Sequence, residues 1–269
     1  MNYTHVAQNP ADPYENPYTG KSIPLDVALG KIDTLDLNAS YAGTIPLWYR
    51  LLNCGFRLPA SAGTDTFLNR IASRLPGGDR VYVKINGPLT YENWIDNLRA
   101  GRSFVSNGPQ LEFTAENSGL GETLELAAAR SVRIKARADS QFPMDKVEVI
   151  YNGKVAAAAT LSPDRKSATL EMDLMLDRSG WLSFRASGSG HADHPVGTLD
   201  AHCSPIYVVV AGKPAGSQED AEYFLKWIER LSVAIRTRDR IPDPQLRQQV
   251  QSYLEAARGV YVKIAGQGT

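Results

Sequence analysis

The chain has 269 residues with 29 basic and 29 acidic side chains, so its formal net charge is zero. This length suits at least two hydrophobic cores, and the balanced charge with no basic run excludes the usual electrostatic footprint of a nucleic-acid binder. No stretch approaches the roughly 20 apolar residues that span a bilayer, so we expect a soluble protein whose partner is a small molecule or a protein, and no membrane.

Cysteine content and the first residues bear on the compartment. Cys54 and Cys203 lie far apart in sequence, so they predict neither a disulfide framework nor a cysteine-rich zinc site. The start "MNYTHVAQNP" has no basic region followed by an apolar run, which argues against a signal peptide. The localisation is left open.

The first hundred residues alternate helix-like and strand-like segments. After an opening strand at 2–5, the predicted units are a helix at 25–29 with a strand at 32–37, a helix at 46–54 with a strand at 56–62, and a strand at 81–85 with a helix at 90–100. Gly30, Gly55 and Gly101 stand where these helices should end. Parallel strands need helical crossovers, so repeated units of this kind predict a parallel sheet or barrel.

Two polar side chains follow predicted strands in this region. In parallel α/β folds, chemistry collects at the carboxyl ends of the strands. Asp65 comes just after the strand at 56–62, among small residues that let other groups approach, and His5 ends the opening strand. Both are therefore candidate functional residues. The alternatives are that Asp65 caps a turn and that His5 is simply solvated.

From about residue 110 the pattern changes to short strands and turns. Val132, Ile134, Ala136 and Ala138 alternate with basic residues, which predicts one buried and one wet face. Asn152-Gly153 between two strand-like runs is a strong hairpin signal. With three further strand-like runs, the pattern predicts an antiparallel β-sandwich over residues 110–211.

The last segment returns to helices. Ser217 with Asp220 three residues later marks a helix start, and "IPDP" at 241–244 breaks the helix before a second amphipathic stretch. The predicted organisation is therefore a βα unit over 1–109, the sandwich over 110–211, and a helical hairpin over 212–269 that packs on the other domains.

Several stretches carry a family resemblance. They are "IPLDVALGKIDTLDL", "WYRLLNCGFRLPASAGTDTF", "LPGGDRVYVKINGPLTYENWIDNLRAGRSFVSNGP", "SGWLSFRA" and "AHCSPIYV". Together they resemble, in order and over nearly the whole chain, the carboxyl-terminal part of the carbaryl-hydrolase-type branch of the PHP (polymerase and histidinol phosphatase) metallohydrolases. The resemblance implies a distorted βα barrel that holds divalent zinc, manganese or iron and aims metal-activated water at an ester, carbamate or phosphoester.

The resemblance also assigns metal ligands. "AGTDTF" is similar to the family's Gly-Ser/Thr-Asp motif, which makes Asp65 a metal ligand, although Phe67 stands where many members have a histidine. "YTHVAQNP" resembles a strand that ends in His-Pro, which makes His5 a second ligand, with Val6 in place of the proline. The family's His-x-His motif has no counterpart in the chain, so we expect the chain alone to be catalytically incomplete.

Three further residues match family positions near the barrel mouth. Arg102 would hold an anion or oxyanion and Asn107 would orient it, and His202 would reach toward the same place. The alternatives are a helix end and turn for Arg102 and Asn107, and a buried structural hydrogen bond for His202. His191 and His194 have the spacing of a metal pair, but they lie in a glycine-rich loop with no third ligand nearby.

Two functions follow from these predictions. In the first, the chain is the carboxyl-terminal part of a metal-dependent hydrolase with a small ester or phosphoester substrate. In the second, it is a binding or assembly module for a carbohydrate or a partner chain, and exposed strand edges would favour homo-oligomers. A dimer that completes a metal site is a weaker third hypothesis, because each copy supplies few ligands.

Overall fold

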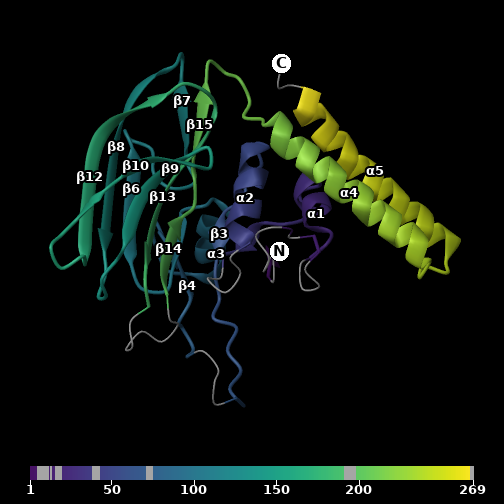
Figure 1. Ribbon diagram of the computed structural model, residues 1–269, viewed down its shortest axis with the longest axis horizontal. Coiled ribbons are helices and arrows are strands. Elements are labelled where there is room, and N and C mark those ends of the chain that lie inside the picture. Colours follow the sequence, from purple (N-terminus) through teal and green to yellow (C-terminus); the bar gives the residue numbers. More distant parts are fainter. Residues whose placement is uncertain are drawn as a thin grey trace.

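A computed structural model describes residues 1–4, 12, 14–15, 20–37, 43–70, 75–190 and 198–266. The described chain has a mixed α/β fold, mostly sheet, that ends in a pair of long helices (Figure 1). The two larger sheets lie on one side of the molecule and the helical pair on the other, with shorter helices between them (Figure 1). No helix in the described ranges is both long and apolar enough to cross a membrane.

The amino-terminal part forms a small parallel sheet. Its strands, in spatial order, are β1 (Asn2–Tyr3), β2 (Thr34–Asp36) and β3 (Ala60–Ser61), with α1 (Ile23–Ala28) and α2 (Thr44–Asn53) as the intervening helices. Gly30 and Gly55 follow these helices with positive φ angles of 64° and 88°, which confirms the predicted helix ends. β3 is shorter than the predicted strand at 56–62. Pro59, just before it, has no N–H to donate to a neighbouring strand.

The third predicted unit does not join this parallel sheet. β4 (Arg80–Val83) and β5 (Ser103–Ser106) pair antiparallel, with α3 (Tyr91–Arg99) between them in sequence. α3 begins as predicted, because the Thr90 hydroxyl accepts a hydrogen bond from the Asn93 N–H. Val83 lies opposite Ser103, so the loop and helix leave and return at the same end of the strand pair. A parallel pairing would have required a crossover to the opposite end.

The remaining strands form two larger sheets. The eight-stranded sheet runs β10-β9-β13-β14-β5-β4, with β15 paired to β13 and β7 paired to β15, and the four-stranded sheet runs β11-β12-β8-β6. The bounds are β6 (Gln110–Ala115), β7 (Thr123–Leu126), β8 (Arg130–Asp139), β9 (Lys146–Tyr151), β10 (Lys154–Ala158), β11 (Thr160–Leu161), β12 (Ser167–Leu176), β13 (Gly180–Gly188), β14 (Leu199–Cys203) and β15 (Ile206–Val210). Pairing within these two sheets is antiparallel except between β7 and β15, which are parallel, and the eight-stranded sheet includes β4 and β5 from before residue 110.

The two larger sheets share one apolar core. Val132 and Ile134 of β8 are buried in the same cluster as Val147 and Val149 of β9 and Phe184 of β13. The predicted alternation of β8 is confirmed, since its basic residues are exposed. The predicted hairpin between β9 and β10 is also confirmed: Asn152 and Gly153 both have positive φ, 50° and 81°, as the tight turn requires.

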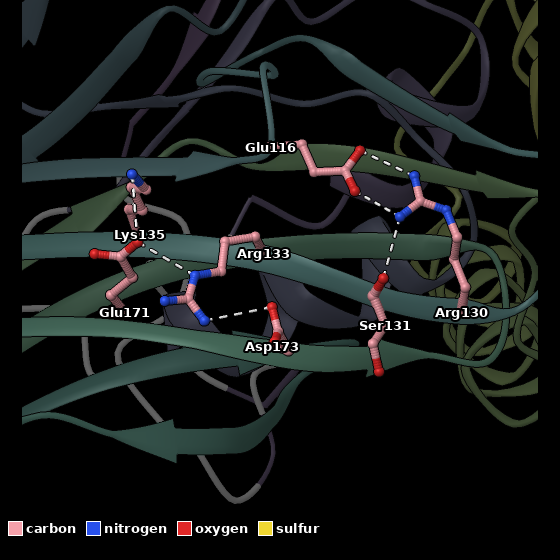
Figure 2. Close-up of polar contacts among 7 residues, drawn as sticks. All are labelled: Glu116, Arg130, Ser131, Arg133, Lys135, Glu171 and Asp173. Carbon is pink, nitrogen blue, oxygen red and sulfur yellow. Dashed lines mark hydrogen bonds and ion pairs between the residues drawn. The ribbon is translucent and has the colours of Figure 1, made fainter.

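The outer face of the four-stranded sheet is covered by charged side chains (Figure 2). Arg133 on β8 pairs with Glu171 at 3.2 Å and with Asp173 at 3.5 Å on β12, and Lys135 pairs with the same Glu171 at 3.3 Å (Figure 2). Arg130 makes a two-point contact with Glu116. Exposed ion pairs add little stability because water and salt screen them. The charged side chains therefore mark this face as the one in contact with water.

The carboxyl-terminal helices pack back on the amino-terminal unit. α4 (Gln218–Arg238) begins at Ser217, whose hydroxyl accepts from the Asp220 N–H, and α5 (Pro244–Gly266) follows the predicted break. The second apolar core joins these helices to α1, α2 and the face of the eight-stranded sheet that is turned away from the four-stranded sheet. Its largest fully buried members are Trp48, Trp181, Tyr261 and Phe224.

Candidate functional site

A cavity of about 370 Å³ lies where two parallel strands end. Leu37 directly follows β2 and Ala62 directly follows β3, and both line it. Its opposite wall is the face of the eight-stranded sheet that is turned away from the core shared with the four-stranded sheet. We call this space the strand-end cavity. Its polar lining is Asp79, Asn107, Lys146, Glu148, Arg185, Ser187, Asp200 and His202, with Ser106 beside them.

The sheet wall presents two rows of polar side chains. In the first row, Arg185 of β13 lies opposite Glu148 of β9 on one side and His202 of β14 on the other. In the second row, Ser187 lies between Lys146 and Asp200. Residues two apart on a strand point to the same face, so both rows face the cavity together.

Arg185 and Glu148 form the best-defined ion pair of the wall. Nε and Nη2 of Arg185 lie 2.9 and 2.8 Å from one oxygen of Glu148, and the Glu148 side chain is 15% exposed. Counting Lys146, Arg185, Asp79, Glu148 and Asp200, the lining has two cations and three carboxylates. The formal charge of these five described side chains is therefore −1 when all are ionised.

His202 is buried and both of its ring nitrogens are engaged. Nδ1 lies 2.9 Å from the Cys203 carbonyl oxygen, which can only accept, so Nδ1 carries the proton. Nε2 then accepts a 2.6 Å hydrogen bond from the Tyr49 hydroxyl. Burial lowers the pKa of His202 to about 4, with the nearby Arg185 charge acting in the same direction and the Cys203 carbonyl opposing it. Burial raises the pKa of Tyr49 to about 12.

These contacts limit the chemistry that the wall offers. A histidine with a pKa of about 4 and no free ring nitrogen is a poor general base near neutral pH. The Ser183 hydroxyl lies 3.3 Å from Nδ1, but it donates to the Cys203 carbonyl at 2.7 Å and is fully buried. The described lining can therefore bind and orient a small polar molecule, and His202 holds α2 against β14.

The predicted site residues are only partly brought together. Asn107 and His202 line the strand-end cavity. Asn107 also fixes the turn after β5, because its Oδ1 accepts from the Asp200 N–H and its Nδ2 donates to the Thr198 carbonyl, both at 2.8 Å. Arg102 lines a different cavity, and its Nη1 donates to Asn97 Oδ1 at 2.9 Å.

Asp65, one of the two predicted metal ligands, lies outside the lining of the strand-end cavity. It is exposed and has a φ of 54°. Its neighbour Thr64 fixes this turn, since its hydroxyl accepts from the Asp79 N–H at 3.2 Å and donates to the Asp79 carbonyl at 3.1 Å. His5, His191 and His194 lie outside the described residues.

Sequence reasoning missed Arg185, Glu148, Lys146, Asp79 and Asp200. In "GWLSFRAS", Ser183, Arg185 and Ser187 alternate with apolar residues, as they would on a solvated face, but the structure shows that this strand is buried along most of its length. An arginine inside such a strand indicates a second layer that covers the polar face.

Comparisons with protein-family models, curated proteins and solved structures gave no match.

Proposed function

We propose that the chain is the carboxyl-terminal part of a PHP-type metal-dependent hydrolase and that it supplies the substrate-binding wall of the active site. The observation that carries this proposal is the strand-end cavity, because its polar lining meets the carboxyl ends of β2 and β3. In the same proposal, the three parallel strands belong to a distorted barrel and the two sheets with a shared core are a β-sandwich. The chain alone is then catalytically incomplete.

The proposal also implies a metal ion in the complete active site. A bound zinc, manganese or iron ion would supply activated water at neutral pH. Among the residues that the structure describes, no three His, Cys, Asp or Glu side chains converge as such an ion requires. The described residues therefore do not form a complete metal site, and their part in the reaction is to bind and orient the substrate.

The charges of the strand-end cavity favour one substrate class. In the described part of the lining, carboxylates outnumber cations by three to two, and Arg185 pairs with Glu148. A phosphodiester anion would meet net repulsion, whereas an uncharged ester or carbamate would find N–H donors without that cost. We therefore favour an uncharged ester or carbamate over a phosphoester as the substrate.

Binding of small probes tests this proposal. We expect ethyl N-methylcarbamate to shift the backbone NMR signals of Asn107 and His202 saturably, and dimethyl phosphate to bind more weakly. Ala62→Leu places a larger side chain at the strand end and should weaken carbamate binding by about tenfold or more, which is 1.4 kcal/mol. Ala128→Leu, at an exposed position outside the cavity, is the matched control. Carbamate shifts that spread over the surface, or that survive Ala62→Leu unchanged, would contradict the proposal.

The predicted metal ligand has its own test. Elemental analysis of the purified, unchelated protein should be compared between the parent chain, Asp65→Ala and His191→Ala. If zinc, manganese or iron is bound, we expect Asp65→Ala to lose it and His191→Ala to retain it, because a single lost ligand weakens a site of three or four. Metal that persists in Asp65→Ala would defeat the assignment of Asp65.

The second candidate function is a binding module without catalysis. It is favoured by one observation, namely that His202 has no free ring nitrogen and that the described residues form no complete metal site. In that case, glucose or another neutral sugar should bind the strand-end cavity, while ethyl N-methylcarbamate should not.

A further inference from the structure

A second cavity, of about 500 Å³, opens on the other face of β5. It lies between two sheet edges, because β4 ends the eight-stranded sheet and β6 ends the four-stranded sheet. We call it the β4–β6 groove and define it by Tyr82, Lys84, Arg102, Phe104, Leu111 and Phe113. None of these residues lines the strand-end cavity, so the groove is separate from the proposed hydrolase site.

One wall of the groove combines an aromatic pair with a pair of cations. Tyr82 and Phe104 are opposite each other on β4 and β5, and their rings stack with centroids 4.8 Å apart and planes at 8°. Lys84 and Arg102 form the next row on the same face, since the Lys84 N–H donates to the Arg102 carbonyl at 2.8 Å.

No carboxylate of the described residues pairs with Lys84 or Arg102. Arg102 donates from Nη1 to the neutral amide oxygen of Asn97, and within the described ranges neither Arg102 nor Lys84 makes an ion pair. Like charges directly opposite each other on neighbouring strands destabilise a sheet. An anion placed between them would offset that repulsion, and a guanidinium presents a planar pair of donors that suits a carboxylate.

The opposite wall is formed by apolar residues of β6 that pack mostly into the core shared by the two larger sheets. Leu111 and Phe113 of β6 are each only 4% exposed, and Leu120 lies beside them. Two carboxylates also line the groove. Glu122 accepts from the Gly119 N–H at 2.8 Å within its own turn, and Glu112 lies between Leu111 and Phe113 on the exposed side of β6. The cationic row and these apolar residues therefore line the same space.

We propose that the β4–β6 groove binds a small amphipathic anion, a carboxylate attached to an apolar ring or chain. The carboxylate lies against Arg102 and Lys84, and the apolar part lies along the Tyr82–Phe104 pair and the β6 side chains. This is a ligand site beyond the proposed hydrolytic function.

Three small molecules that share one apolar group and differ in charge test the proposal. The probes are 3-phenylpropionate, 3-phenylpropan-1-ol and 3-phenylpropylamine, titrated into the full chain at pH 7.5 and followed by backbone NMR. We expect saturable shifts at Val83, Phe104 and Phe113, with the carboxylate bound about tenfold more tightly than the alcohol and the amine weakest. Equal affinity for all three, or tighter binding of the amine, would overturn the proposal, as would shifts at His202 in place of those at Phe104.

Variants distinguish the contribution of the charged side chains to binding from that of the apolar lining. Lys84→Gln and Arg102→Gln should each weaken 3-phenylpropionate binding by about fivefold or more while leaving the alcohol unchanged, because only the charge-assisted contact is lost. Glu112→Gln should tighten binding of the carboxylate, since it removes a like charge from the rim. Lys154→Gln, at an exposed position on the far edge strand β10, is the matched control. Because Lys84 is exposed, its variant keeps the test decisive if Arg102→Gln fails to fold, and an unchanged affinity in Lys84→Gln would overturn the proposal.

Discussion

Trp181→Ala is expected to lower the free energy of unfolding by about 3–5 kcal/mol. Trp181 is fully buried on β13, and its ring packs on Tyr49 and Trp48 of α2 with centroids 4.8 and 6.3 Å away. Its Nε1 donates to Asn53 Oδ1 at 2.8 Å, and Asn53 in turn donates to Asp220 of α4 at 2.9 Å. One side chain therefore links the eight-stranded sheet, α2 and α4. Urea unfolding followed by circular dichroism would measure the change.

Two variants show which part of Trp181 matters. Trp181→Phe keeps most of the apolar contact but loses the donor to Asn53, so we expect an intermediate loss of about 1–3 kcal/mol. Trp94→Ala removes a half-buried tryptophan from α3 outside this core and should cost less than Trp181→Ala. If the losses in Trp94→Ala and Trp181→Ala are the same, the contacts of Trp181 do not connect the layers as described.

Local features of the fold were predictable because neighbouring residues determine them. The alternation in β8, the Asn152-Gly153 turn and the Ser217 helix start each depend on a few consecutive residues. The partner of β4 was not predictable in this way. A strand followed by a helix suits a parallel crossover equally well, and only the long-range pairing of Val83 with Ser103 shows that the chain turns back at the same end.

The candidate site was less predictable than the fold. Asn107 and His202 were singled out from the resemblance, and both line the strand-end cavity. Arg185 and Glu148 were missed, because alternating polar residues on β13 and β9 are what a solvated face would also show. That face is covered because the parallel sheet and α2 pack against it, a contact between segments more than 100 residues apart. The metal ligands Asp65 and His5 stay predictions.

Acidification from pH 6.5 to pH 4 is expected to remove about 3 kcal/mol of stability through His202 alone. The pKa of a histidine in an unfolded chain is about 6.5, whereas burial lowers that of His202 to about 4. Between these pH values the unfolded chain binds a proton at His202 that the native state does not bind. The contribution of His202 to the free energy of unfolding is therefore fully present above pH 6.5 and is lost as the pH falls toward 4. The full difference of about 2.5 pKa units, at about 1.4 kcal/mol each, is about 3.5 kcal/mol. The loss between pH 6.5 and pH 4 is somewhat smaller, about 3 kcal/mol, because the unfolded chain is already half-protonated at pH 6.5 and the native state is half-protonated at pH 4.

Comparison with variants isolates this contribution from that of the carboxylates, which titrate in the same range. His202→Gln can still accept from the Tyr49 hydroxyl but binds no proton, so it should be less stable at pH 7.5 and lose less stability on acidification. Tyr49→Phe removes the donor to Nε2 but leaves the buried imidazole, so its stability should still fall on acidification, and more steeply than that of His202→Gln. Urea unfolding at pH 7.5, 6.5, 5.5 and 4.5 would measure all three proteins. A His202→Gln curve parallel to that of the parent would mean that the pKa of His202 is the same in the folded and unfolded chains, which would contradict the prediction.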